Sequence, residues 1–313
     1  MANTNNLRID VVIDHLCTLG EGPVWDARRK LICWVDILNG IIHQFSPAEK
    51  KHSLIDMHQM IGSFAVCTDG NFIAALQNGF AFVDSKTGEI KIINDPESHL
   101  PGNRFNDGKC DPAGRFWAGT MALSEESGLG NVYTIHSDLA SSKKIEGVSI
   151  SNGMAWSADH KTFYYIDSPT FEIVAYDYSI NTGHISNKRT IIKIPKEDGS
   201  PDGMTIDIDG MLWVAHWGGW QITRWDPEKA QKIYSIKLPV EKVTSCTFGG
   251  ESFGDLYITS AKVGLSENEL KRQPLAGSLF VVQKCGFKGM PAFEFRCQRN
   301  SKTFLSSIPE KIP

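Results

Sequence analysis

The sequence predicts an all-β fold, a six-bladed β-propeller of four-stranded antiparallel blades. Two observations predict it. A short apolar or aromatic run recurs with a period of roughly 40–50 residues, which is the length of one propeller blade. Each run follows a polar turn, such as TDGN or DPAGR, whose Asp, Gly and Pro residues suit hairpins. An array of immunoglobulin-like sandwiches would also be rich in strands, but it would not repeat this turn chemistry at one phase six times.

Each recurring run predicts the second strand of a blade. The runs read LICWVD, FIAAL, FWAGT, TFYYID, MLWVAH and DLYITS, and their equivalent positions are Trp34, Ile73, Trp117, Tyr164, Trp213 and Tyr257. A third strand follows each run, as in GIIHQFSP, FAFVDSKTG, NVYTIHSD, EIVAYDYS, QITRWDP and SLFVVQK. These runs are rich in β-branched and aromatic residues, which are typical of β-strands.

We expect one domain over residues 1–313, with the repeats filling about residues 10–290. Closed β architectures often form a single unit at this length. Residues 291–313 follow the sixth repeat and are polar, with Pro, Lys and Ser. This composition predicts a C-terminal tail that wraps the surface or is partly disordered.

Composition argues against several classes of protein. The net charge is −4, and Lys and Arg form no block that would attract nucleic acid or an anionic membrane. The polar start, residues 1–6, predicts no secretory signal, and no window of about 18 apolar residues predicts a membrane helix. We therefore expect a cytoplasmic protein that binds neither nucleic acid nor membrane, as a monomer or a weak homo-oligomer.

The cysteines and histidines suggest no metal site of their own. The seven cysteines are odd in number and irregularly spaced, without a CxxC pair, so we expect reduced and mostly buried thiols. The histidines at positions 43, 52, 58 and 99 follow no ligand spacing. We expect His43, His52, His58 and His99 to lie at the surface or in loops.

A polar residue stands at one fixed phase before each second strand, where the innermost strand of the blade should begin. These residues are Glu21, Ser63, Asn106, Asn152, Asp202 and Ser245. In a propeller such strand starts ring one mouth of the central channel. The two carboxylates and two amide oxygens among them suit a hard divalent cation. Each Asn-Gly or Asp-Gly pair alone would more often be a turn, but four at one phase favour a metal site.

Long motifs at these same places resemble the SMP-30/gluconolactonase/LRE family. They are LGEGPVWD, NRFNDGKCDPAGRFWAGTM, SNGMAWSADHKTFYYID, PDGMTIDIDGMLWVA, VTSCTFGG and RQPLAGSLF, and the similarity covers about residues 9–289. The resemblance implies a six-bladed propeller with one divalent metal ion, Ca²⁺ foremost, with Zn²⁺, Mn²⁺ or Mg²⁺ as alternatives. It implies metal ligands at Glu21, Asn152 and Asp202, with Asp202 also the catalytic residue.

The resemblance further implies that Arg104 and Asn106 bind substrate. The regucalcin branch of the family has a substrate-contacting Glu shortly after GTMA, but this sequence has Ser124 there, followed by Glu125 and Glu126. We expect Glu125 to supply that carboxylate. The family's activity implies a metal-dependent hydrolase that opens sugar lactones, such as gluconolactone, to the aldonic acid.

Two alternatives remain open. The first is a non-enzymatic, regucalcin-like calcium-binding protein. The second is an esterase or phosphotriesterase acting on non-sugar substrates. A serine nucleophile is disfavoured, because neither Ser63 nor Ser245 lies in a G-x-S-x-G elbow.

Overall fold

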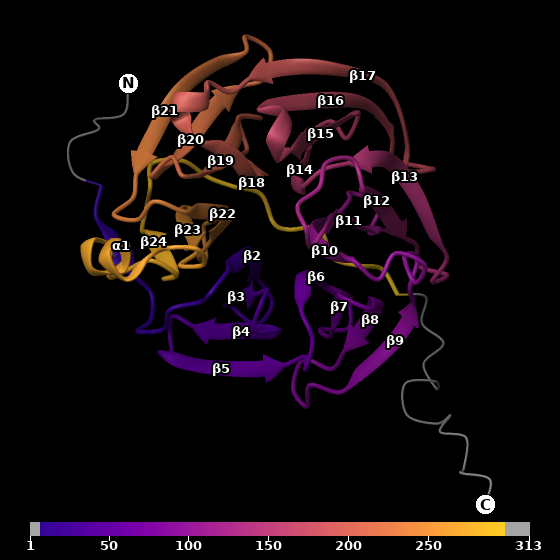
Figure 1. The fold of residues 1–313 in the computed structure, drawn as a ribbon, viewed down its shortest axis with the longest axis horizontal. Coiled ribbons are helices and arrows are strands. Elements are labelled where there is room, and N and C mark those ends of the chain that lie inside the picture. Colours follow the sequence, from indigo (N-terminus) through magenta and orange to yellow (C-terminus); the bar gives the residue numbers. More distant parts are fainter. Residues whose placement is uncertain (1–6, 298–313) are drawn as a thin grey trace, which may run out of the picture.

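The computed structural model describes residues 7–297 and confirms the predicted architecture. Six four-stranded antiparallel sheets surround a central channel as the blades of a propeller (Figure 1). Within five of the blades the chain passes from the innermost strand outward by hairpins, so neighbouring strands in sequence are neighbours in the sheet. Every one of the six expected second strands and six expected third strands is present.

The strands occupy four concentric positions. The innermost strands are β2 (Gly20–Asp26), β6 (Ile61–Val66), β10 (Asn103–Cys110), β14 (Ser151–Trp156), β18 (Ser200–Ile206) and β22 (Val243–Gly249). The second strands are β3 (Leu31–Asp36), β7 (Phe72–Leu76), β11 (Phe116–Ala122), β15 (Thr162–Asp167), β19 (Leu212–Trp217) and β23 (Asp255–Ser260). The third strands are β4 (Ile41–Ser46), β8 (Gly79–Val83), β12 (Gly130–Ile135), β16 (Glu172–Ser179), β20 (Gln221–Asp226) and β24 (Phe280–Val282).

The outermost strands show how the ring closes. They are β5 (Lys51–Asp56), β9 (Ile90–Asn94), β13 (Ser141–Val148), β17 (His184–Lys193), β21 (Gln231–Lys237) and, in the sixth blade, β1 (Ile9–Val11). The first strand of the chain thus completes the last blade, where Ile9 pairs with Val282 and Val11 with Phe280. This exchange joins the two ends of the repeat through a sheet, so the ring cannot open without breaking strand hydrogen bonds.

A buried aspartate repeatedly joins a blade's first hairpin to its core. In the third blade, Asp111 accepts hydrogen bonds from the backbone N–H of Arg115 and from the indole of Trp117, at 2.9 and 3.0 Å. In the fifth blade, Asp207 accepts from Met211 N–H and from Trp213, at 3.0 and 2.9 Å. One carboxylate therefore closes the polar turn and fixes a fully buried tryptophan, which explains why turn and run recur together.

The core lies between and within the blades. Trp34, Trp117 and Trp213, all on second strands, are at most 1% exposed. All seven cysteines are free thiols and six are buried, as expected. The expectation for the histidines was wrong for His43, which is fully buried on β4, and for His52, which lies part-buried on β5, because both belong to strands of the first blade rather than to loops. His58 and His99 are exposed, as expected.

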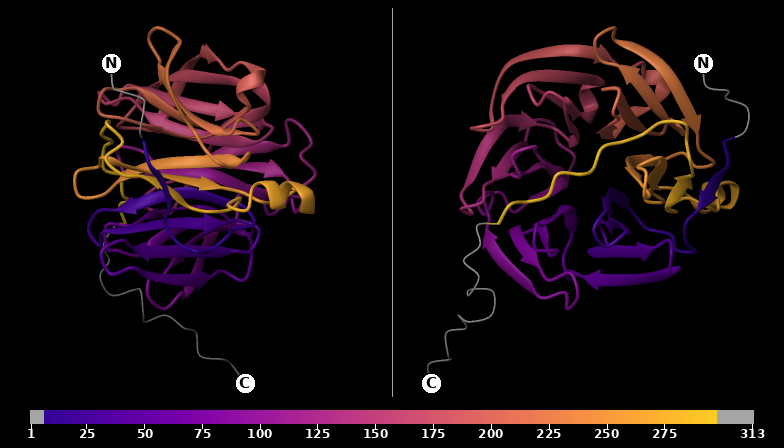
Figure 2. Two further views of the ribbon diagram at one scale, coloured as in Figure 1. Left: turned by 90° about the vertical axis from the view of Figure 1, so that its left-hand side faces the viewer. Right: turned by 180° about the vertical axis from the view of Figure 1, so that it is seen from behind.

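The segment after β24 crosses the end of the channel at which the innermost strands finish. We call residues 290–297 the C-terminal strap. Phe295 forms a parallel bridge with Cys67, just after β6, while Gly289 bridges Asp207, just after β18. Figure 2 shows the strap running across this end of the ring. Residues 290–293 of the strap line that end of the channel, and Phe295 is fully buried between the second and third blades. Residues 298–313 lie outside the described part of the chain.

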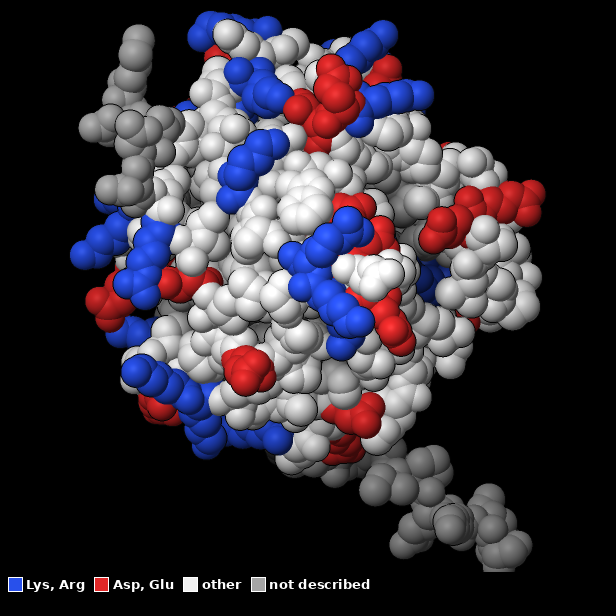
Figure 3. Space-filling view, turned by 60° about the vertical axis from the view of Figure 1, so that its left-hand side comes forward, with Lys and Arg blue, Asp and Glu red and all other residues white. Residues whose placement is uncertain are grey.

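The opposite end of the channel is the mouth, where the innermost strands begin. Because each second strand returns toward this end, the connections to the third strands surround it. Three short helices lie among the connections at this end: η1 (Ser168–Thr170), η2 (Lys196–Asp198) and α1 (Glu267–Arg272). Within residues 7–297, no helix has the length and apolar character needed to cross a membrane. Charges of both signs are interspersed on the face in Figure 3.

Candidate metal and substrate site

Every innermost strand carries a β-bulge close to its start. The ladder register shifts by one extra residue between Glu21 and Val24, and again beside Asn106, Asn152, Asp202 and, in the remaining two blades, next to Ser63 and Ser245. A bulge bends its strand and redirects a side chain away from the regular pleat. The six polar residues of the predicted phase are therefore grouped at the mouth by a repeated backbone irregularity.

Small residues let these bulges approach one another. A Cβ on Gly153 would lie 2.6 Å from the Cβ of Met204 and 2.8 Å from the carbonyl oxygen of Asp202. A Cβ on Gly203 would overlap the side chain of Ser245. The Gly that follows each of Asn152 and Asp202 is thus required for close packing of neighbouring blades around the channel, in addition to any role in the bulge.

Three carboxyl groups lie at the mouth or just below it and are little exposed to solvent. Glu21 and Asp202 are 6% and 5% exposed, and Asp107, which the sequence analysis did not single out, is 6% exposed. Burial raises the pKa of Glu21 well above its usual range, and the neighbouring Asp202 and Asp107 raise it further. Burial, followed by the charge of Asp107, likewise raises the pKa of Asp202. Such a group of mutually repelling carboxyls is stabilised by a nearby positive charge.

Asn152 lies beside Asp202 and has an unused side-chain oxygen. The side chain is 3% exposed, and its Nδ2 donates to the hydroxyl of Ser168 at 2.9 Å. The Oδ1 atom is buried and accepts no hydrogen bond. Buried polar atoms are nearly always paired, so this oxygen is available to accept a cation. Ser168 lies in η1 and was not predicted, because it follows a second strand and occupies no repeated phase.

Arg104 and Asn106 form a second polar group beside the carboxylates. Arg104 is 8% exposed, and its Nη1 donates to Asn106 Oδ1 at 2.8 Å and to the carbonyl of Phe105 at 2.9 Å. In the described part of the chain its Nε and Nη2 make no hydrogen bond, and no carboxylate oxygen lies within ion-pair distance. Burial lowers the pKa of Arg104 to about 10, against the opposing effect of Glu21, Glu125 and Asp202. The guanidinium therefore has free donors.

Asn106 differs from the other amide of the predicted oxygen set. Its Oδ1 is occupied by Arg104, and its Nδ2 donates to the carbonyl of Ser151 at 2.8 Å. Asn106 consequently lacks the free buried oxygen that Asn152 has. Of the four oxygen donors that share one phase, Glu21, Asp202 and Asn152 are therefore available to a cation. The fourth, Asn106, holds Arg104 instead.

Glu125 lies at the rim. It is exposed in the turn after β11, has a φ of 58°, and its N–H donates to the carbonyl of Ala122 at 3.0 Å. Its charge opposes the lowering of the pKa of Arg104. Ser124 is exposed in the same turn.

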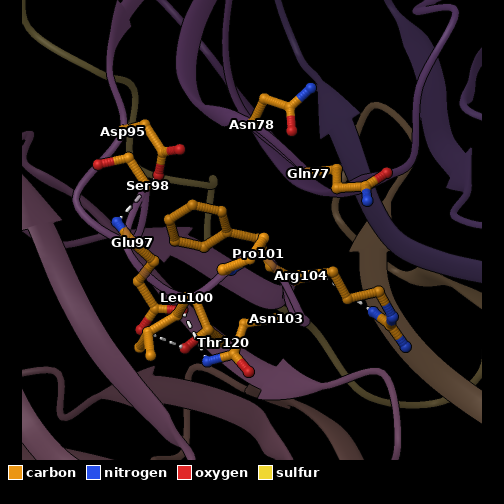
Figure 4. A pocket seen from close by; sticks show the side chains of 11 residues that line it. Gln77, Asn78, Asp95, Glu97, Ser98, Leu100, Pro101, Asn103, Arg104 and Thr120 are labelled. Atoms are coloured by element: carbon orange, nitrogen blue, oxygen red, sulfur yellow. Dashed lines mark hydrogen bonds between the residues drawn. The ribbon is translucent and has the colours of Figure 1, made fainter.

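A polar pocket of about 220 Å³ adjoins Arg104 between the second and third blades. Figure 4 shows Gln77 and Arg104 on one side of it and Asp95 and Ser98 on the other. Glu97 also lines it, but this carboxylate accepts hydrogen bonds from Asn103 and three other side chains and so serves to anchor the loop. The pocket offers amide, hydroxyl and carboxylate groups, which suit a ligand rich in hydroxyl groups.

Below the mouth, the channel narrows to a cavity of about 70 Å³ lined by Asp107 and Lys109 and closed by the strap. Lys109 donates to the carbonyl of Met204 at 2.7 Å, and burial lowers its pKa while Asp107 opposes the shift. Asp107 could have been found from the sequence, because it directly follows Asn106 at the same bulge. Lys109 carried no such signal.

The residues present fit a hard divalent cation. Glu21, Asp202 and Oδ1 of Asn152 offer three oxygen donors, two of them from carboxyl groups. Ca²⁺, Mg²⁺ and Mn²⁺ favour such donors. Arg104 offsets part of the cost of burying Glu21 and Asp202, but their pKa values remain raised, and a bound cation would compensate them further.

Comparison with known proteins gives a consistent result. Residues 19–262 match the family model of the SMP-30/gluconolactonase/LRE-like region. The chain is 39% identical to regucalcin of Gallus gallus and 37% identical to regucalcin of Homo sapiens, in each case over 93% of this chain and 99% of the relative.

Solved structures share the whole fold. A luciferin-regenerating enzyme superposes with a TM-score of 0.87 at 30% identity, over 93% of this chain and 100% of the other. A calcium-binding protein, regucalcin, from Agrobacterium tumefaciens gives 0.88 at 27% identity, over 93% and 98%. A gluconolactonase from Xanthomonas campestris, at 20% identity and a TM-score of 0.70 over 90% of each chain, shares the fold.

Proposed function

The chain belongs to the SMP-30/gluconolactonase/LRE-like family, and from that premise we propose that it is a metal-dependent hydrolase that opens sugar lactones to aldonic acids. Its family and the gluconolactonase among its structural neighbours support a lactonase-type activity. The proposal adds the metal, the substrate class and the roles of individual residues.

One observation carries the metal part of the proposal. Oδ1 of Asn152 is buried without a partner at the same bulge phase as the buried carboxylates Glu21 and Asp202. We assign these three side chains as ligands, with Ca²⁺ as the first candidate. A bound divalent cation supplies Lewis acidity for the lactone carbonyl and a lowered pKa for water.

Asp202 is assigned as the general base. Water adds to the carbonyl carbon, the bond from that carbon to the ring oxygen breaks, and the ring oxygen leaves as a hydroxyl group. Asp202 accepts the proton of the attacking water and returns it to the departing oxygen. A carboxylate in this position can both take and give a proton, and burial raises the pKa of Asp202 above its usual range.

Arg104, Asn106 and Glu125 are assigned to the substrate. The free Nε and Nη2 of Arg104 can donate to two sugar oxygens in a fixed fork. Asn106 holds that fork in place through its own Oδ1. Glu125, exposed at the rim, accepts from sugar hydroxyls. The pocket beside Arg104 is polar, which favours a hydroxyl-rich lactone over an aryl ester.

The test is a panel of aldonolactones, including gluconolactone, galactonolactone, xylonolactone and arabinonolactone, assayed by acid release with and without a chelator. We expect chelator-sensitive turnover that Ca²⁺ restores, and loss of turnover in Asp202→Asn. Metal binding without turnover on any lactone would support the calcium-binding alternative. Turnover confined to aryl esters or phosphotriesters would support the other alternative. Either result would overturn the lactonase proposal.

A further inference from the structure

A second group of ligand-type side chains lies in the first blade, outside the mouth. His15 and Cys17 belong to the segment between β1 and β2, and His43 belongs to β4. One ligand atom from each lies within 4.8 Å of the others. None of these residues stands at the start of an innermost strand, so the group is separate from the carboxylates of the mouth.

The distances fit tetrahedral coordination. Nε2 of His43 lies 3.6 Å from Sγ of Cys17. Two ligands at about 2.3 Å (S) and 2.0–2.1 Å (N) from one tetrahedral zinc ion lie roughly 3.5 Å apart. The ring of His15 lies 4.7 Å from that of His43, centroid to centroid, tilted by 55°. A cation between the three would need little movement of Cys17 and His43.

Neighbouring side chains orient the two buried ligands. Nδ1 of His43 lies 3.0 Å from Nε2 of His52, which can accept a hydrogen bond from the Nδ1–H of His43 and so leave the lone pair of His43 Nε2 free for a metal. Trp34 stacks on His43 with centroids 4.7 Å apart and donates its indole N–H to Sγ of Cys17 at 3.4 Å. A second partner on the far nitrogen of a histidine is the usual support of a metal-binding imidazole.

The burial of the three side chains is also compatible with a cation. Cys17 is 1% exposed and His43 is fully buried, whereas His15 is part-exposed and provides a route from solvent. Nitrogen and sulfur donors select borderline and soft metals over Ca²⁺.

We propose that His15, Cys17 and His43 bind a zinc-class divalent cation, with His52 as the supporting partner and water in the fourth position. The metal would connect the segment after β1 to strand β4, close to where the ring of blades closes. His15 and Cys17 directly follow β1, which completes the sixth blade, and His43 belongs to the first blade. Bound metal should therefore raise the melting temperature of the protein.

The test uses Co²⁺ as a probe on the full-length, chelator-treated protein. We expect a thiolate-to-cobalt absorption band in wild type and, equally, in Asp202→Asn, which removes a mouth ligand. Cys17→Ser should lose the band, and His15→Gln should weaken Co²⁺ binding at least tenfold; the part-exposed His15 keeps the test valid if Cys17→Ser fails to fold. Replacing His52 by Ala should weaken binding by about 10–100-fold.

Cys297→Ser is the matched control. Cys297 is part-exposed and interacts with the buried thiol of Cys67. This pair of thiols is another site at which Co²⁺ could bind sulfur. The band should persist in Cys297→Ser. Absence of a band in wild type at excess Co²⁺, or a band that survives Cys17→Ser and disappears in Cys297→Ser, would overturn the proposal. Loss of lactone hydrolysis in Asp202→Asn with the band retained separates this site from the mouth.

Discussion

Ser168 fixes the orientation of the Asn152 amide. The Ser168 hydroxyl donates its single proton to the carbonyl of Pro201 at 2.7 Å, so toward Asn152 it can only accept. Nδ2 of Asn152 must therefore face Ser168, and Oδ1 must face away from it, buried and unpaired. The direction of the oxygen assigned to the metal is thus determined by Ser168, in the connection after β15, and by Pro201, in the next blade.

Ser168→Ala should weaken divalent metal binding by about 10–100-fold, because the amide loses the partner that holds Oδ1 in place. Calorimetric titration of the chelated protein with Ca²⁺ measures the effect. Thr170→Ala is the control, since Thr170 lies exposed in the same 3-10 helix and bonds only to neighbouring backbone. Equal Ca²⁺ affinity in the two variants would contradict the positioning role.

Asp202→Asn should abolish turnover and metal binding yet stabilise the metal-free protein. The variant removes a buried carboxyl whose own pKa is raised by burial and by the charge of Asp107, and which raises the pKa of Glu21. We expect a gain of about 1–3 kcal/mol in the free energy of unfolding without metal, and little or no gain with Ca²⁺ present. Urea unfolding in chelator and in Ca²⁺ measures both. A variant that is less stable than wild type in chelator would refute the repulsion argument.

Arg104→Ala should raise KM while leaving metal affinity intact. Loss of charge-assisted hydrogen bonds to the substrate costs about 1.5–3 kcal/mol, which corresponds to roughly 10–100-fold in KM. Because Arg104 opposes a cation electrostatically, Ca²⁺ affinity should be unchanged or slightly higher. Arg104→Lys keeps the positive charge but loses the forked pair of donors, so its KM should remain close to that of Arg104→Ala. Loss of Ca²⁺ binding in Arg104→Ala would contradict the assignment.

Phe295→Ala should destabilise the protein by about 3–5 kcal/mol, because it empties a fully buried position in the strap. Phe295 packs with the aromatic core of the second and third blades and lies 6.0 Å from Phe82, centroid to centroid. Denaturant unfolding measures the loss. Since the strap covers the end of the channel away from the mouth, Ca²⁺ affinity and KM should remain within about twofold at temperatures where the variant is folded. A selective loss of Ca²⁺ affinity would instead connect the strap to the site.

His216 should make stability fall as the pH decreases. Burial lowers its pKa in the folded protein to about 4, whereas an unfolded histidine titrates near 6.5. Between these values the unfolded chain binds the proton and the folded chain does not. The contribution is therefore complete above about pH 6.5 and is lost toward pH 4, with a slope of up to about 1.4 kcal/mol per pH unit.

His216→Gln should make that slope shallower, because Gln does not titrate but can still bond to Thr223, which the ring of His216 contacts at 2.6 Å. Urea unfolding between pH 5 and pH 7.5 measures the slopes. His58→Gln, at an exposed position, is the control and should follow wild type. Parallel slopes in wild type and His216→Gln would show that other groups cause the loss.

Much of the fold could be predicted because each blade repeats a local pattern. Turn, apolar run and third strand recur at one period, and a carboxylate such as Asp111 joins the turn to Trp117 within a few residues. The same phase also identified Glu21, Asn152 and Asp202, since equivalent strand starts converge by symmetry. Closure through β1 could not be predicted in this way, because Ile9 pairs with Val282 across nearly the whole chain.

The sequence by itself thus determined the number of blades, the ring of polar strand starts and the family resemblance, all of which depend on local spacing. Only the tertiary structure decided which oxygens remain free. Asn106 and Asn152 look alike in sequence, yet Arg104 occupies the oxygen of one and Ser168 binds the nitrogen of the other. It also brought His15, Cys17 and His43 together. Hydrogen-bond partners and ligand clusters depend on contacts between separate connections and blades, which no period in the chain encodes.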